Sequence, residues 1–292
     1  MRKIREILIE KSLLFSSLIT IAVTLGIITV LAVEAVQFFS EVSIVEFLTD
    51  TQWTPLFTDK HYGILPLLSG TLLTSFIAIS VALPIGLSIS IYLSEYAPSN
   101  FRKTVKPLLE LLAAVPTVVY GFFALVVVTP FLQEIIPNLS GFNSLSAGIV
   151  MGIMIIPYVS SLSEDALHAV PGSLREASYG MGATKLQTAF GVIVPAASSG
   201  IIVSVILAIS RAIGETMIVA VAAGQQPRLT LDPTVPVETI TAYIVQVSLG
   251  DVQHGSVEYR TIFAAGITLF VFTFLLNTLS YRIRKKYQER YE

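Results

Sequence analysis

Two formal charges, Arg211 and Glu215, lie inside a long apolar stretch of the chain. Ionisable side chains are costly inside a membrane segment and usually face a cavity or a partner group. A separation of four residues leaves them about 40° apart around a helix, so both can point into one cavity or pair with each other. Arg211 offers a planar fork of donors that suits an oxyanion, whereas an ionised Glu215 can only accept hydrogen bonds.

This pair predicts one wall of an anion path. An acceptor beside an anion is useful when the anion carries its own proton, as phosphate does near neutral pH and sulfate does not. Ser204 precedes the pair on the same helix face and leaves room for a cavity, so we expect Ser204, Arg211 and Glu215 to line the path. The alternative is a self-satisfying ion pair that only fixes helix packing.

Metal, thiol and nucleotide chemistry are not expected in this chain. It has no cysteine, and His61, His168 and His254 lie far apart without metal-ligand spacing. A phosphate-binding loop of the form Gly-x-x-x-x-Gly-Lys-Ser/Thr does not occur in the sequence. We therefore predict no metal, no cofactor and no enzymatic site.

A polar stretch, Pro171–Pro195, separates two apolar stretches and has the sequence of two short helices. Two pairs fit the pattern in which a Ser or Thr cap and a Glu or Gln three residues later satisfy free backbone amides reciprocally: Ser173 with Glu176, and Thr184 with Gln187. Gly180 or Gly182 supplies the break between the helices. The stretch predicts a helix, turn and helix outside the bilayer, preformed for a cytoplasmic partner.

The elements that position these groups are predicted to be membrane helices. Hydrophobic residues make up 53% of the 292 residues and charged residues only 13%, against about 25% charged in soluble proteins. A bilayer core of about 30 Å needs roughly 20 apolar residues per helix. Six stretches fit, which predicts an all-α polytopic protein with a single transmembrane domain over residues 1–292: Ser12–Val33, Ile64–Tyr92, Leu108–Leu132, Leu145–Leu162, Ala196–Ala223 and Thr261–Tyr281.

Lysine and arginine residues are unevenly distributed among the connections. Most lie in the N-terminus, the second and fourth connections, and the tail, namely Arg2, Lys3, Arg5, Lys11, Arg102, Lys103, Lys106, Arg175, Lys185, Arg282, Arg284, Lys285, Lys286 and Arg290. The other connections hold only Lys60, Arg228 and Arg260, so the positive-inside rule places both termini in the cytoplasm. The net charge of -2 leaves no basic face, so we expect membrane lipid and no nucleic acid as a partner.

The first and third connections on the opposite side are acidic and long. The first also contains several aromatic residues, among them Phe47, Trp53 and Phe57, a pattern typical of an interfacial belt. The third predicts a surface helix within Val237–Leu249 that ends at Gly250. This helix is a candidate docking surface for an external partner.

The stretch Pro171–Pro195 resembles the signature of the permease subunits of binding-protein-dependent ABC importers, Glu-Ala-Ala, three residues, Gly, nine residues, then Ile-x-Leu-Pro. Glu176, Ala177, Gly182 and Pro195 match it in register, whereas Ser178, Val192 and Val194 replace the usual Ala, Ile and Leu. The resemblance implies the type I permease fold of these importers. It also implies that Glu176, Ala177, Gly182 and Pro195 belong to a coupling helix that sits in a cleft of the ATPase subunit.

Nearly the whole chain resembles the phosphate-specific permeases of this class, most specifically in Ser210–Met217 and also in Phe47–Pro55, Tyr92–Ala97 and Val115–Gly121. The resemblance implies a multi-pass protein of the cell inner membrane that forms a heterodimer with a sister permease. It further implies two ATPase subunits, a periplasmic phosphate-binding protein and phosphate as the cargo.

Three alternatives remain open at this point. The first is a permease of the same class for another oxyanion, such as sulfate or molybdate. The second is a secondary transporter driven by an ion gradient, in which the stretch Pro171–Pro195 would lack a role. The third is a membrane sensor that transports nothing.

Overall fold

The computed structural model describes residues 2–287 and the side chains of residues 6–282. Every regular element in this part is a helix, which confirms the all-α prediction. The helices are α1 (Arg2–Glu41), α2 (Ile44–Thr49), α3 (Leu65–Ile91), α4 (Ser99–Ala114), α5 (Thr117–Phe123), α6 (Thr129–Ile135), α7 (Ser144–His168), α8 (Gly172–Gly180), α9 (Lys185–Thr188), α10 (Val194–Ala196), α11 (Ser198–Ile213), α12 (Met217–Ala222), α13 (Ile240–Leu249) and α14 (Val257–Tyr287), with π-helical turns η1 (Tyr92–Tyr96), η2 (Ala124–Val128) and η3 (Ala189–Ile193).

The centre of the bundle is the packing of α3 against α7. A Cβ added at Gly148 would lie 2.7 Å from Ile77 Cβ, and one at Gly152 would lie 2.7 Å from the carbonyl oxygen of Ala78. The absence of side chains at Gly148 and Gly152 therefore lets the two helices approach closely. Ser204, Ala208 and Ala212 of α11 are buried as well, so α11 also packs deep in the bundle.

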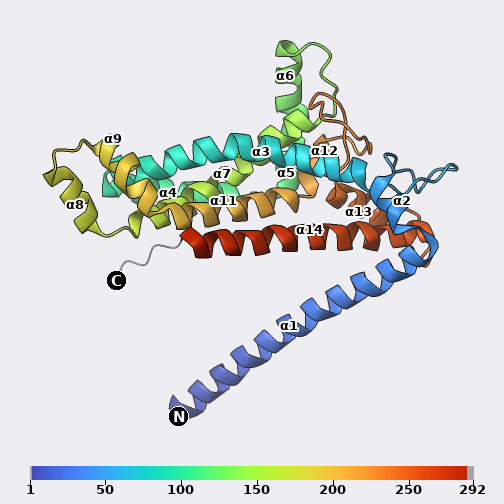
Figure 1. The fold of residues 1–292 in the computed structure, drawn as a ribbon, viewed down its shortest axis with the longest axis horizontal. Helices are drawn as coiled ribbons and strands as arrows, with labels where there is room; N and C mark the ends of the chain where they lie inside the picture. Colours follow the sequence, from blue (N-terminus) through green and yellow to red (C-terminus); the bar gives the residue numbers. More distant parts are fainter. Residues whose placement is uncertain (1, 288–292) are drawn as a thin grey trace.

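Both α1 and α6 extend away from this bundle (Figure 1). Figure 1 shows α1 leaving the N-terminal end of α14 and extending away from the other helices. The last turns of α1 are anchored by Arg260 of α14, which forms ion pairs with Glu34, at 3.7 Å, and Glu41, at 2.6 Å. Most of α1 is exposed, whereas Phe38 near its end is completely buried.

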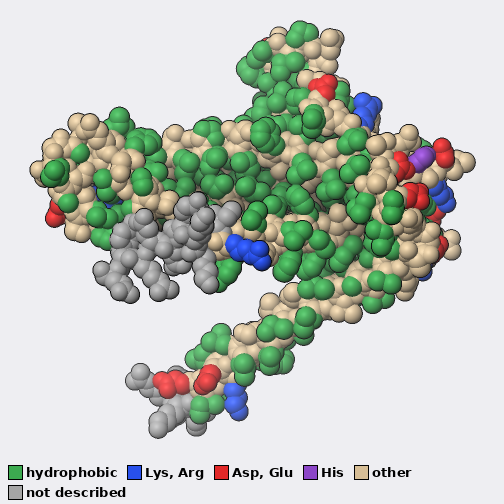
Figure 2. All heavy atoms as spheres, viewed as in Figure 1, with side chains coloured by type: hydrophobic (Ala, Val, Ile, Leu, Met, Phe, Trp, Pro, Cys, Tyr) green, Lys and Arg blue, Asp and Glu red, His purple; other side chains and the backbone are tan. Residues whose placement is uncertain are grey.

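Five described helices are long and apolar enough to cross a membrane, and a sixth span exists if one bent pair is counted as a unit. The bent pair joins Lys185–Ala196 to Ser198–Ile213 at an angle of 72°. Figure 2 shows hydrophobic side chains spread over the long middle of the molecule, with charged side chains gathered near the end that carries α2. This distribution is that of a membrane protein.

Two of the expected spans have breaks that the sequence reading did not include. The expected span Leu108–Leu132 is interrupted because Val115 is extended, with ψ of 131°, and Pro116 follows it. Proline lacks a backbone donor and disfavours a helical residue before it, so α4 ends at Ala114 and α5 begins at Thr117. The expected span Ala196–Ala223 breaks after Ile213, where α11 ends, and α12 begins at Met217.

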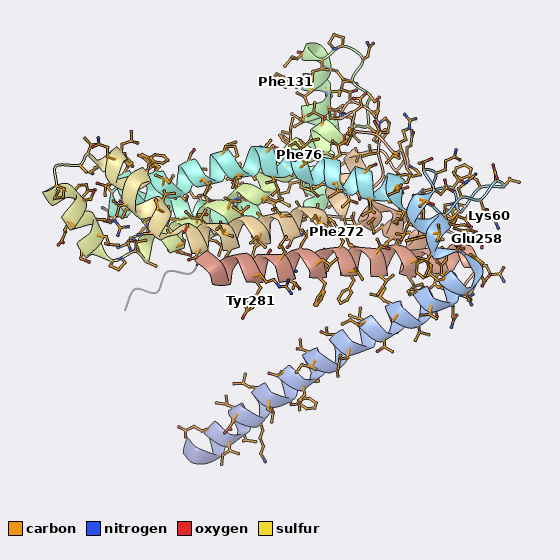
Figure 3. The ribbon with its side chains drawn as sticks, viewed as in Figure 1. Lys60, Phe76, Phe131, Glu258, Phe272 and Tyr281 are labelled. Atoms are coloured by element: carbon orange, nitrogen blue, oxygen red, sulfur yellow. The ribbon has the colours of Figure 1, made fainter. Side chains whose placement is uncertain are left out.

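The connections form two ends of the molecule. At the end that carries α2 and α13, Trp53 packs edge-on against Tyr243 with ring centroids 5.1 Å apart, and Lys60 pairs with Glu258, as Figure 3 shows. Phe47 and Trp53 are buried in this cluster, so only Phe57 of the expected aromatic belt is exposed. The predicted surface helix is confirmed as α13, and Gly250 follows its last residue.

The opposite end carries α8 and α9 (Figure 1). Near it, Glu164 of α7 is completely buried and lies 2.5 Å from Arg102 and 2.8 Å from Lys106, both on α4. A carboxylate this deeply buried requires paired cations, so the network fixes α4 against α7. The sequence reading used Arg102 and Lys106 only as signs of orientation and missed their partner.

Candidate functional site

The stretch predicted to couple the chain to an ATPase projects from the end of the bundle as two helices, α8 and α9 (Figure 1). Glu176 and Ala177 are exposed on α8. Gly182 follows α8 with φ of +83°, a left-handed conformation that favours glycine, so of the two glycines considered it is Gly182 that makes the turn. Pro195 lies in α10, immediately before the bend between α10 and α11.

One of the two predicted capping boxes is confirmed. Thr184 Oγ1 accepts from Gln187 N at 3.3 Å, and Gln187 Oε1 accepts from Thr184 N at 2.8 Å, so α9 begins as expected. The prediction of a second capping box, formed by Ser173 and Glu176, is wrong. The helix α8 starts at Gly172 after Pro171, which places Ser173 inside the first turn, where its hydroxyl does not cap the helix.

The tip of this projection is apolar, which the sequence reading missed. Met181 is 89% exposed, Leu186 59% and Tyr179 41%. Exposed large apolar groups next to the acidic Glu176 give a surface suited to insertion into a protein cleft. The signal was present in the sequence, because Met181 and Leu186 flank the glycine turn, but exposure could not be inferred there.

A second residue that the sequence reading missed is Arg175, which ties α8 to the bundle. Arg175 Nη2 donates to Glu95 Oε1 at 2.9 Å, and Arg175 Nε donates to Glu95 Oε2 at 3.2 Å. The same guanidinium donates to the carbonyls of Leu167 and Val170, at 2.8 and 2.7 Å, just where α7 ends. Because Glu95 lies in η1, one side chain joins α8 to the ends of α3 and α7.

The predicted pair of Arg211 and Glu215 is close in space but does not lie on one continuous helix. Arg211 Nη2 lies 3.4 Å from Glu215 Oε2, and Arg211 Nη2 also lies 3.9 Å from the sulfur of Met154. Arg211 is in the last turn of α11, whereas Glu215 is in the break before α12. The Arg211 side chain is 36% exposed and that of Glu215 only 2%.

Glu215 has a structural task that explains the break. Its Oε1 accepts from Met217 N at 3.1 Å and from Ile218 N at 3.4 Å, which are free amides of the first turn of α12. The carbonyl of Glu215 accepts from Thr241 Oγ1 of α13 at 2.6 Å. Of the two expected arrangements, the structure has the pairing of the two side chains, with Arg211 partly exposed and Glu215 directed into the protein, and their place on an anion path stays a prediction.

Ser204 does not join this pair. It is completely buried, its hydroxyl lies 2.6 Å from that of Ser163 on α7, and it donates to the carbonyl of Ile201 at 2.8 Å. The structure places Ser204 in the contact between α11 and α7. The space beside this small residue, which the sequence suggested could be a cavity, is occupied by α7.

Comparison with known proteins shows to which protein family the chain is related. Residues 82–291 match the family described as "Binding-protein-dependent transport system inner membrane component". The probable ABC transporter permease protein YqgH of Bacillus subtilis is 37% identical over 90% of this chain and 85% of its own length. The phosphate transport system permease protein PstC of Mesorhizobium japonicum is 35% identical over 80% of this chain and 76% of its own length.

Solved structures share the fold. The bacterial alginate ABC transporter, in complex with a periplasmic protein bound to an alginate pentasaccharide, has a chain with a TM-score of 0.62 at 19% identity, covering 94% of this chain and 95% of its own. The MetNI methionine ABC transporter in an inward-facing conformation gives a TM-score of 0.57 at 20% identity, covering 78% and 95%. The predicted type I importer permease fold is thereby confirmed. With its exposed two-helix projection, its apolar bundle and these relatives, the chain belongs to the family of binding-protein-dependent ABC transporter permeases, the inner-membrane components of such systems.

Proposed function

We propose that the chain is one half of the translocation path of an ATP-driven importer for inorganic phosphate. The observation that carries this proposal is the similarity to a PstC phosphate permease at 35% identity across 80% of the chain. The fold supports transport of some cargo, whereas the named relatives support phosphate in particular.

The proposed assembly contains the chain as a heterodimer with a sister permease, two copies of an ATPase subunit and an external phosphate-binding protein. The exposed tip formed by Tyr179, Met181 and Leu186, with Glu176 beside it, enters a cleft of the ATPase. Glu176, Ala177, Gly182 and Pro195 act in coupling. The end that carries α8 and α9, and both termini, are cytoplasmic.

Arg211 is the proposed anion contact on the path. Its guanidinium is half-exposed, and Glu215 holds one side of it while leaving other donors available. Glu215 poises Arg211 and starts α12, whereas Ser204 contributes through the packing of α11. An arginine held by a buried carboxylate at a helix break presents a positioned positive charge to an oxyanion.

Reconstitution tests this function. The four kinds of subunit are placed in proteoliposomes, and uptake of radiolabelled phosphate is measured with and without ATP and with unlabelled sulfate or molybdate as competitors. We expect ATP-dependent uptake that only phosphate suppresses. Suppression by sulfate or molybdate would transfer the proposal to that oxyanion, and uptake that follows an ion gradient without ATP would exclude an ATP-driven importer.

A further inference from the structure

A hollow of about 160 Å³ lies at the end that carries α2 and α13. Trp53, Glu238 and Tyr243 belong to its lining, and each is at most 2% exposed. The rim is formed by exposed residues, namely Leu56, Phe57, Gln225, Gln226 and Gln246. The volume is several times that of one water molecule, which is about 30 Å³.

The position of Glu238 is imposed by the backbone around it. A Cβ added at Gly70 of α3 would lie 2.2 Å from the Glu238 carbonyl oxygen, so α3 packs directly on this segment. Ile240 N donates to Thr71 Oγ1 at 3.1 Å, and Val237 N donates to the carbonyl of Ala223 at 3.0 Å. By contrast, Glu238 Oε1 is buried without a hydrogen-bond partner among the described residues.

A buried carboxyl group without a cation beside it favours its neutral form. No lysine or arginine is among the residues that line the hollow. Burial raises the pKa of Glu238 to about 8. At neutral pH the group is therefore mostly a carboxylic acid, with one O–H to donate and one carbonyl oxygen to accept.

The other groups around Glu238 favour an acceptor as ligand. The buried indole N–H of Trp53 interacts with the Tyr243 hydroxyl, short of a hydrogen bond of normal geometry, so the acceptor is needed by the O–H of the Glu238 acid. The Tyr243 hydroxyl is taken by Thr261 at 2.6 Å. Beyond the rim, Arg228 donates to Gln226 at 2.9 Å. A second hollow shares Leu56 and Phe57 with this one. Its lining includes Asp251 and the ion pair of Lys60 and Glu258.

We propose that this hollow is a capture site for a proton-bearing oxyanion, inorganic phosphate in the case of this chain, held by the Glu238 carboxyl and the amides of the rim beside Trp53. The choice of phosphate rests on the proposed function. Phosphate accepts from the O–H of the acid and donates its own O–H to the acid's carbonyl oxygen, whereas sulfate has no proton to donate and a cation cannot accept from the acid. The site lies next to the path, because Thr241, three residues after Glu238, bonds the break at Glu215.

Trp53 is the only tryptophan of the chain and therefore reports on the hollow directly. The purified full chain in detergent is titrated with inorganic phosphate, sulfate or chloride at constant ionic strength and pH 7, and tryptophan emission is recorded. We expect a saturable change with phosphate and at least a tenfold weaker response to sulfate. Glu238→Leu, which fills the same space without polar atoms, should abolish the phosphate response.

The proton of Glu238 gives a second, independent readout. With a pKa of about 8, the neutral acid and hence phosphate affinity fall by roughly tenfold from pH 7 to pH 9. Glu238→Gln keeps a donor and an acceptor but cannot ionise, so it should bind at pH 7 and lose this fall. The ratio of wild-type to Glu238→Gln affinity at each pH cancels the titration of phosphate itself.

Several results would overturn the proposal. An equal response to phosphate, sulfate and chloride would mean that the hollow holds water only, and an unchanged response in Glu238→Leu would remove Glu238 from the site. If Glu238→Leu does not fold, a wild-type pH dependence in Glu238→Gln is enough to reject the proposal. Failure of these titrations leaves the uptake experiment standing, since wild-type uptake tests the function and the emission tests only the hollow.

Discussion

Arg211 and Glu215 form a pair of charged residues in which Glu215 has structural contacts and Arg211 keeps exposed surface. The carboxylate of Glu215 starts α12 through Met217 N and Ile218 N, and it also lies 3.4 Å from Arg211. Arg211 is the partner that keeps exposed surface. The two residues are therefore expected to respond differently to substitution, although each is the other's nearest countercharge.

Substitution of Arg211 by glutamine tests its role in the path. A hydrogen bond to a charged group contributes about 1.5–3 kcal/mol, so we expect phosphate uptake to fall by roughly 10- to 150-fold with assembly of the complex intact. Lys103→Gln, at an exposed lysine near the start of α4, is the matched loss of one positive charge and should leave uptake unchanged. Wild-type uptake by Arg211→Gln in an intact complex would show that the pair only fixes packing.

At the scale of elements, the projection of α8 and α9 is held at two points that have different physical origins. The turn depends on the left-handed backbone of Gly182. The attachment to the bundle depends on the Arg175 guanidinium, which joins η1 and the end of α7 to α8. We expect a movement imposed on α8 by a partner to reach α3 and α7 through these contacts.

Gly182→Ala tests the turn. A left-handed conformation costs a residue with a Cβ about 1–2 kcal/mol, so the native turn should lose population by roughly 5- to 30-fold relative to alternatives. We expect ATP hydrolysis to persist while its stimulation by loaded binding protein falls. Gly180→Ala is the control, because Gly180 is the last residue of α8 and has no atom within 4 Å of an added Cβ. Equal stimulation in both variants would contradict the assigned turn.

A charge exchange tests the attachment. Arg175→Glu alone places two carboxylates together and removes the donors to Leu167 and Val170, so uptake and stimulated hydrolysis should both fall by at least tenfold. Combining it with Glu95→Arg restores the attraction between α8 and η1, and we expect partial recovery of the ratio of stimulated to basal hydrolysis. If the double variant assembles but this ratio does not recover, the ion pair of Arg175 and Glu95 serves only folding and not coupling.

At the scale of the whole molecule, most connections gather at two ends on opposite sides of an apolar bundle, whereas α6 and the connection after it project from its flank (Figures 1 and 2). Contacts between distant parts of the chain support this grouping. Lys60 pairs with Glu258 at one end, and Glu95 pairs with Arg175 at the other. The alternation of connections inferred from lysine and arginine agrees with these contacts, while the side of the membrane on which each end lies is a prediction.

Single cysteines in this cysteine-free chain test the orientation. Lys185→Cys on α9 should be protected from a membrane-impermeant thiol reagent applied to intact cells, and Asp59→Cys, whose side chain is 96% exposed, should react. Both variants should react after the cells are permeabilised, which controls for access. Labelling of position 185 from outside would reverse the topology.

Much of this architecture was determined by the sequence itself. The apolar stretches, the Thr184 cap and the position of α13 depend on local composition and spacing, and they appear in the structure, apart from the two helix breaks. These features are predictable because helix periodicity and capping act over a few residues of one chain.

Only the tertiary structure decided where the helices break and which polar groups meet. Glu164 with Arg102, Arg175 with Glu95 and the isolated carboxyl of Glu238 involve residues that are far apart in the sequence or placed by packing. Ser204 was misplaced for the same reason, because a small residue allows either a cavity or a neighbouring helix, and the neighbour is Ser163 of α7. Local periodicity specifies a helix and its apolar face, whereas the packing of the whole chain selects the partner of each polar side chain.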